Sequence, residues 1–244
     1  MPCASYVDPR LAAVYDHLNP PGKEDGFYAA LAGAPPSIIL DMGCGTGRFA
    51  CQLAKLGHRV TGADPAGAML GIARGREGGE RVTWVETDAA GLHLATRFDL
   101  IIMTGHAFQT LLSDTEIHAA LQAFARHLGP CGKLAFETRN PLAREWETWI
   151  PALLRETVRL PDGSSVEVHN DIRLATGELV TYETHFRFGP DDVAVGVDTL
   201  RFIDQARLTK HLMDAGFNAL ASYGDWDGST VGPSSPELIV ICQP

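Results

Sequence analysis

Three carboxylates are spaced so that they could bind a cationic ligand. Asp41 follows the apolar run 38–40, and Asp64 and Asp88 come at or just after the ends of the next two strand-like runs. The carboxyl ends of parallel strands lie along one edge of a sheet, so these acids are expected to meet there. Carboxylates attract an amine or ammonium group and oppose a dianionic pyrophosphate. The sequence therefore predicts a site for a ligand that carries positive charge.

A glycine-rich turn follows the first of these strands. Gly43, Gly45 and Gly47 allow the backbone to turn tightly and to approach a ligand without a Cβ in the way. The helix after the turn directs its free N–H groups and the positive end of its dipole at the same place. The spacing from Gly45 to Ala50 also fits the dinucleotide fingerprint G-x-G-x-x-G/A, so a nicotinamide or flavin site is an alternative. Asp41 argues against it, because its carboxylate would oppose the pyrophosphate.

The pattern Asp41-x-Gly43-x-Gly45-x-Gly47 resembles motif I of the class I S-adenosylmethionine-dependent methyltransferases. The resemblance covers residues 37–140 and 204–243. It implies S-adenosylmethionine as the cofactor and an α/β fold, namely a Rossmann-like, doubly wound, seven-stranded, mostly parallel sheet with an inserted antiparallel sheet. The insert resembles the lids of small-molecule methyltransferases, the glycine/sarcosine N-methyltransferase type among them.

The resemblance also implies roles for individual residues. Asp64 would bind the ribose hydroxyls and Asp88 the adenine amine, although either acid could instead be a helix cap or an ordinary turn residue. Tyr15 would close over the methionine moiety, with plain packing as its alternative. The cofactor-binding set expected on this basis comprises Asp41, Gly43, Cys44, Gly45, Gly47, Asp64, Pro65, Met69, Asp88, Ala89, Thr104 and Tyr15.

Polar residues after the fourth and fifth strand-like runs are candidates for the acceptor site. His106 suits a general base for an oxygen or protonated-amine acceptor, and a plain loop histidine is the alternative. Arg139 suits a carboxylate on the acceptor, unless it pairs with one of the acids of the protein. Gln109 and Trp226 complete the predicted substrate-binding set, and Trp226 could instead simply pack.

The composition suits a globular protein that acts on a small molecule. The chain has 244 residues, of which 45% are hydrophobic, and a net charge of −10. This charge argues against nucleic acid or an anionic membrane as the main partner, because both require a basic surface. The cysteines form no C-x-x-C pair, and no apolar run reaches about 18 residues, so a reduced, cytoplasmic setting is expected.

Alternating strand-like and helical runs predict a parallel core. Alternation of this kind, which begins at Ser37, is typical of right-handed crossovers with the ligand at the carboxyl ends of the strands. Two closing strands are expected at 217–223 and 237–242, the last one antiparallel as in the family that the chain resembles. The expected division is an N-terminal helical cap at 1–36, a methyltransferase core at 37–149 and 204–244, and an antiparallel insert at 150–203.

The insert shows the alternation of a sheet with one buried face. Apolar and polar residues alternate along 166–174 and 180–188, and a turn is predicted at 161–163. Because so small a sheet is not stable alone, its apolar face is expected to close over the acceptor as a lid.

A three-residue loop at 175–177 would set the register of the hairpin in this insert. Leu174 would then pair with Glu178, which places His169 opposite Glu183 and Glu167 opposite His185. These histidines are therefore interpreted as partners on the sheet surface, and no metal site is expected.

The hypothesis that joins these features is methyl transfer from S-adenosylmethionine to a small-molecule acceptor by in-line displacement. Orientation of the acceptor and exclusion of water would be the main tasks of the protein. The alternatives are a regulatory protein that binds S-adenosylmethionine without turnover and a nicotinamide-dependent oxidoreductase.

Overall fold

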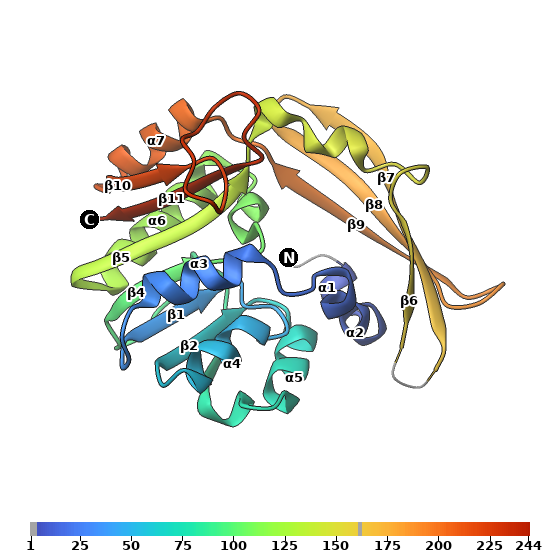
Figure 1. The fold of residues 1–244 in the computed structure, drawn as a ribbon, viewed down its shortest axis with the longest axis horizontal. Helices are drawn as coiled ribbons and strands as arrows, with labels where there is room; N and C mark the ends of the chain where they lie inside the picture. Colours follow the sequence, from blue (N-terminus) through green and yellow to red (C-terminus); the bar gives the residue numbers. More distant parts are fainter. Residues whose placement is uncertain (1–3, 161–162) are drawn as a thin grey trace.

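A seven-stranded sheet and a separate four-stranded sheet make up the computed structural model, which describes residues 4–160 and 163–244 (Figure 1). The larger sheet has the strand order β10-β11-β5-β4-β1-β2-β3. Its strands are β1 (Ile38–Met42), β2 (Arg59–Asp64), β3 (Thr83–Glu86), β4 (Phe98–Met103), β5 (Leu128–Arg139), β10 (Asn218–Tyr223) and β11 (Glu237–Gln243). Only β11 runs against its neighbours, so the predicted doubly wound, mostly parallel sheet with an antiparallel last strand is confirmed.

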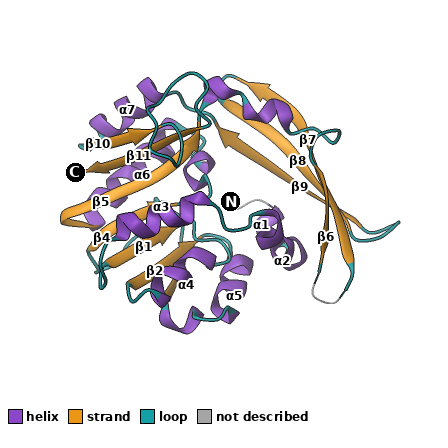
Figure 2. Ribbon diagram, viewed as in Figure 1, coloured by secondary structure: helices purple, strands orange, loops and turns teal. Residues whose placement is uncertain are grey.

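Helices cover both faces of this sheet (Figure 2). Side chains alternate along a strand, so Leu40 of β1 packs with α6 and α7 while Ile39 packs with α3 and α4 on the other face. The α-helices are α1 (Ala4–Val7), α2 (Pro9–Leu18), α3 (Lys23–Ala32), α4 (Arg48–Lys55), α5 (Gly67–Gly75), α6 (Asp114–His127) and α7 (Gln205–Asp214). Short 3₁₀ helices are η1 (Gly79–Arg81), η2 (Ala107–Thr110), η3 (Pro141–Ala143) and η4 (Glu145–Thr148). None of the helices in the described ranges has the length and apolar character needed to span a bilayer.

Capping hydrogen bonds define the starts of α6 and α7. Ser113 and Glu116 form the reciprocal capping box at the start of α6. The side chain of Asp204 accepts a hydrogen bond from the backbone N–H of Arg207 at the start of α7. The strand β5 begins directly after α6, because Leu128 already pairs with Phe98 of β4.

The four-stranded sheet lies between β5 and α7 in the chain. It has the order β6-β7-β8-β9 with every neighbouring pair antiparallel. Its strands are β6 (Arg155–Arg159), β7 (Ser165–Thr176), β8 (Leu179–Arg187) and β9 (Val193–Arg201). The turn predicted at 161–163 falls partly outside the described residues.

The predicted register of the β7–β8 hairpin is wrong. The loop has two residues, Gly177 and Glu178, because Gly177 (φ +57°) supplies the positive φ that such a loop needs at its first position. A bulge between Ile172 and Leu174 then shifts the pairing back by one residue. His169 consequently lies opposite His185 instead of Glu183, and the two rings stack with centroids 4.7 Å apart. Glu167 lies opposite Arg187 instead of His185.

An ionic cluster holds the end of β9 against the larger sheet's helices. The buried Arg201 places its Nη2 2.5 Å from Asp114 at the start of α6 and its Nε 2.8 Å from Glu178 of the hairpin loop. Arg207 of α7 bonds to the same two carboxylates. The four-stranded sheet is thus fixed to the core at one end by paired charges that are partly shielded from water.

Candidate functional site

A cavity of about 770 Å³ is lined by residues from both sheets. Loops at the carboxyl ends of β1 to β5 form one side of it, α1 and α2 contribute Tyr6 and Tyr15, and the four-stranded sheet forms the other side. The predicted residues that line it are Tyr15, Gly43, Gly45, Asp64, Pro65, Met69, Asp88, Ala89, Thr104, His106 and Arg139. The predicted residues that do not line it are Asp41, Cys44, Gly47, Gln109 and Trp226.

Gly45 and Gly47 of the turn serve different purposes. A Cβ added at Gly45 would meet only the Tyr15 ring at 3.9 Å, so this backbone is open toward the cavity. A Cβ at Gly47 would overlap the Trp84 ring and lie 2.7 Å from Ala73 Cβ. Gly47 is therefore explained by close packing of the turn on its neighbours rather than by contact with the cavity.

Asp64 at the end of β2 fixes the shape of the turn. Its Oδ2 accepts from the backbone N–H of Gly45 at 2.9 Å, and its Oδ1 accepts from that of Ala66 at 2.8 Å. Burial raises the pKa of this carboxyl, while the two backbone N–H groups lower it again in part. The N-cap of α5 is Ala66, so Asp64 is not the helix cap. Asp64 instead fixes the turn from the cavity wall, and each carboxylate oxygen keeps a further lone pair for a ligand.

Asp41 lies beneath the turn, and its Oδ1 has no hydrogen-bond partner among the described residues. The side chain is 1% exposed, and burial, with Asp64 and Glu137 nearby, raises its pKa to about 7. An unpartnered buried oxygen is costly unless a ligand satisfies it. Burial also raises the pKa of the neighbouring Cys44 thiol, which therefore behaves as a small neutral side chain.

Asp88 lies in the loop after β3 and is exposed. Its Oδ1 accepts a hydrogen bond from the backbone N–H of Gly91 at 2.7 Å, which orients the carboxylate on the cavity wall. The three predicted acids therefore come together at one edge of the sheet, two of them on the cavity and Asp41 behind the turn.

His106 lies on the acceptor side of the cavity and is held at two points. Its backbone has the left-handed conformation (φ +59°), and its N–H donates to Glu137 Oε1 at 2.8 Å. Its ring Nε2 lies 3.0 Å from both carboxylate oxygens of Glu237, the first residue of β11. Burial disfavours charge on this pair and raises the pKa of Glu237 to about 8.

Glu137 on β5 is a buried support for this loop. Besides the His106 N–H, it accepts a hydrogen bond from the Tyr28 hydroxyl at its other oxygen, Oε2. Burial raises the pKa of the Glu137 carboxyl and of the Tyr28 hydroxyl. Tyr28 thus belongs to the packing of the core.

Arg139 extends toward the cavity from the end of β5. Its Nε donates to Glu145 at 3.1 Å, its Nη1 donates to Gln109, and its guanidinium lies 5.1 Å from the centroid of the Trp149 ring. Gln109 is 1% exposed, so it orients Arg139 from behind instead of lining the cavity as predicted.

Trp226 does not fit the substrate-binding role predicted for it. Its ring packs edge-on against Phe27 and Tyr28, with centroids 5.5 and 5.8 Å away. It is therefore part of the aromatic cluster on the α3 side of the sheet, which is the packing alternative.

The inner face of the four-stranded sheet carries polar residues that the sequence analysis missed. Asn170 and Thr184 line the cavity, and Thr184 Oγ1 donates to Asn170 Oδ1 at 2.9 Å. The buried Asp198 lines the cavity from the neighbouring β9. Side chains two positions apart on a strand lie on the same face of the sheet. Asn170 lies between Val168 and Ile172 at this spacing, so the sequence alone could have placed it on their apolar face.

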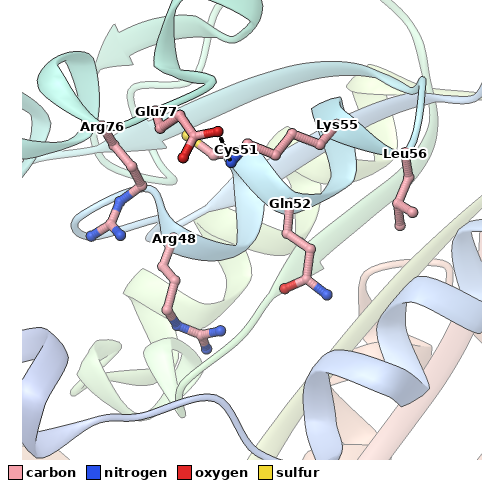
Figure 3. A pocket seen from close by; sticks show the side chains of 7 residues that line it. All are labelled: Arg48, Cys51, Gln52, Lys55, Leu56, Arg76 and Glu77. Atoms are coloured by element: carbon pink, nitrogen blue, oxygen red, sulfur yellow. Dashed lines mark ion pairs between the residues drawn. The ribbon is translucent and has the colours of Figure 1, made fainter.

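A second hollow, of about 410 Å³, lies on the outer side of α4 (Figure 3). Its cations are paired, since Arg48 bonds to Asp25, Arg76 bonds to Asp16, and Lys55 lies 3.2 Å from Glu77. These ion pairs account for the cations that line the hollow, so their presence is explained without a ligand.

Comparison with known proteins matches the first half of the core to a described family. The family "Methyltransferase domain" matches residues 39–132. The cypemycin N-terminal methyltransferase of a Streptomyces species is 32% identical over 103 residues, which is 42% of this chain and 42% of that protein. The malonyl-[acyl-carrier protein] O-methyltransferase of Bacillus cereus is 35% identical over 102 residues, 41% of this chain and 36% of that protein. The chain thus spans less than half the length of these curated relatives.

Solved structures match over nearly the whole chain. The CcbJ methyltransferase from Streptomyces caelestis has a TM-score of 0.77 at 24% identity, with 98% of this chain and 97% of that chain covered. CalS10 from Micromonospora echinaspora, an amino pentose methyltransferase solved with S-adenosylmethionine, has a TM-score of 0.68 at 22% identity, with 93% and 96% covered. At such identities the likeness establishes the fold, with the four-stranded sheet included.

Proposed function

We propose that this chain, a member of the class I S-adenosylmethionine-dependent methyltransferases, transfers the methyl group of that cofactor to a small-molecule acceptor. The observation that carries the proposal is the single cavity, which joins the carboxyl edge of the seven-stranded sheet to the inner face of the four-stranded sheet. A cofactor and an acceptor can thereby share one space.

The residues at the carboxyl edge fit S-adenosylmethionine. The unpartnered Oδ1 of Asp41 marks a place for a hydrogen-bond donor, and the open side of Gly45 leaves room for a close approach. We assign Asp64 to the ribose hydroxyls and Asp88 to the adenine amine, and Tyr15 covers the turn. When bound, the cofactor supplies an electrophilic methyl group whose bond to sulfur breaks with the electron pair left on sulfur.

His106 and Arg139 serve the acceptor in this proposal. The acceptor gives the proton of an N–H or O–H group to His106, and the electron pair left behind forms the bond to the methyl carbon. Arg139 provides a fixed donor for an anionic or carbonyl group of the acceptor. CalS10 acts on an amino pentose, which supports an acceptor of similar size and polarity.

The four-stranded sheet selects the acceptor in this proposal. Asn170, Thr184 and Asp198 supply polar groups on its inner face, whereas the groups assigned to the cofactor lie in the loops after β1, β2 and β3. Sheet and core together exclude water from the reacting atoms.

Thermal unfolding with candidate ligands tests the cofactor assignment. S-adenosylhomocysteine at about 100 times its Kd should add roughly 2.7 kcal/mol to the stability, whereas NAD should add nothing. Asp64→Ala should weaken this binding in calorimetry, and the exposed Asp191→Ala serves as its control. Stabilisation by NAD alone would favour the oxidoreductase, and tight S-adenosylhomocysteine binding without methylation of any acceptor would favour the regulatory protein.

A further inference from the structure

We infer that Glu237 is a positioning residue for the proposed methyl transfer: it holds the imidazole of His106 by Nε2 so that Nδ1 is the ring atom that meets the acceptor. This inference rests on the proposed function and adds to it a partner that prepares His106 to accept a proton from the acceptor. It also predicts that the two side chains gain and lose protons as one unit.

The position of Glu237 follows from the direction of its strand. A strand that runs against its neighbours begins at the edge where they end, so the first residue of β11 lies at the carboxyl edge. In the ladder Glu237 pairs with Arg139 of β5. The side chain is 7% exposed and does not line the cavity, so it can reach the acceptor only through His106.

Two contacts leave His106 little freedom to turn. Its backbone N–H is bound to Glu137, which is itself held by the Tyr28 hydroxyl. Its Nε2 is equidistant, at 3.0 Å, from both oxygens of Glu237. Within residues 4–160 and 163–244, no side chain forms a hydrogen bond with Nδ1 of His106. The residue itself lines the cavity.

The pair has two protonation states that matter. An ionised carboxylate accepts only, so with Glu237 charged the proton lies on Nε2 and the lone pair on Nδ1, the form that can take a proton. Uptake of a proton at Nδ1 makes the pair neutral overall, because Glu237 compensates the new positive charge through Nε2–H. The step therefore creates no net buried charge.

Burial disfavours the anionic form of the pair and so raises the pH at which Nδ1 loses its proton. The pKa of Glu237 is raised to about 8 mainly because burial penalises its charged form. The other charged groups that act electrostatically on the pair are Glu137 and Arg139 of β5, Glu145 of η4, Glu24 of α3 and Asp225 of the β10–β11 loop. The positive charge of Arg139 lowers the pKa of Glu237, whereas the negative charges of the acids raise it.

Nitrogen NMR of the full chain labelled at histidine, with S-adenosylhomocysteine bound, tests the inference. The His106 signals are identified by their loss in His106→Asn. In the wild type, Nδ1 should lose its proton with an apparent pKa above the ordinary histidine value of about 6.5, and the neutral ring should carry its proton on Nε2. Glu237→Gln keeps an acceptor but removes the charge, so the same tautomer should persist with an apparent pKa at least about one unit lower.

Glu237→Leu should abolish the preference for one tautomer, and the exposed Glu77→Gln should change nothing. An unchanged titration and tautomer in both Glu237 variants would overturn the inference. Calorimetry with S-adenosylhomocysteine, run on each variant, reports independently on the fold and the cofactor site. If the wild type shows the coupled titration but methylates no acceptor, the proposed function fails while the pairing of Glu237 and His106 stands.

Discussion

The side chain of Gln109 joins the acceptor side of the core to the end of the four-stranded sheet. Its Oε1 accepts from Arg139 Nη1 at 2.9 Å, and its Nε2 donates to the backbone carbonyl of Arg201 at 3.1 Å. Arginine can only donate and a carbonyl can only accept, so these partners fix the orientation of the amide. The guanidinium of Arg139 and the position of β9 are therefore coupled through one buried residue.

Gln109→Leu should raise the KM for the acceptor and leave the affinity for S-adenosylhomocysteine unchanged. The variant removes a partner from Arg139 and leaves the Arg201 carbonyl unpaired, which should cost about 1–3 kcal/mol of unfolding free energy. Denaturant titration and steady-state kinetics measure the two effects. Gln122→Leu on the exposed side of α6 is the matched control, and an acceptor KM that stays unchanged would separate Gln109 from the acceptor site.

Asp41→Asn should stabilise the ligand-free protein at high pH while weakening cofactor binding. The folded-state pKa of Asp41, about 7, lies above its unfolded value, so between about pH 4 and 7 the folded state binds more protons. Stability from this group is therefore lost as the pH rises through 7. At pH 8 the variant should gain on the order of 2–4 kcal/mol over the wild type, and at pH 4 the two should nearly coincide.

Denaturant unfolding across this pH range measures the difference, with Asp191→Asn as an exposed control. Equal pH dependence in Asp41→Asn and in the wild type would show that the Asp41 carboxyl is ionised freely in the folded state. Calorimetry with S-adenosylhomocysteine on the same samples tests the cofactor role.

Gly45→Ala should mainly weaken cofactor binding, whereas Gly47→Ala should mainly lower the melting temperature. Both positions have positive φ, which costs about 1–2 kcal/mol for alanine. At Gly47 the methyl group also collides with Trp84 and Ala73, so the melting temperature should fall much further. At Gly45 the methyl group projects toward the cavity, so the main effect should be weaker S-adenosylhomocysteine binding. Equal melting temperatures for the two variants would contradict this division.

Thr184→Val should raise the acceptor KM by about threefold to tenfold without affecting cofactor affinity. The substitution keeps the shape of the side chain but removes the hydroxyl that bonds to Asn170 on the cavity wall, a loss of about 1 kcal/mol. Thr181→Val is the matched control, because Thr181 lies on the same strand, bonds to Thr199 and does not line the cavity. Identical kinetics for both variants would remove β8 from acceptor recognition.

The parts of the fold that the sequence predicts are those that local patterns determine. The glycine turn and the acids at strand ends depend on residues a few positions apart, and the structure contains both. The shared edge of the parallel strands then brings Asp64 and Asp88 to one cavity.

The parts that the sequence does not predict depend on pairings between distant segments. Tyr28 and Glu137 are 109 residues apart, and His106 and Glu237 are 131 residues apart. Only the register of β11 against β5 makes Glu237 a neighbour of the cavity loops, and nothing near it in the sequence marks that register. The prediction of the hairpin register fails for a related reason, since the position of the loop and one bulge together determine every pair beyond them.

The direction of β11 has a practical consequence for labelling and immobilisation. The strand starts at the cavity edge with Glu237 and ends at Gln243 on the opposite edge of the sheet, while α1 and α2 line the cavity (Figure 1). A fluorophore or surface linker attached after Pro244 would therefore sit far from the acceptor. The same group attached to α1 would lie beside the cavity, so sensors built on this chain should be tethered through the last strand.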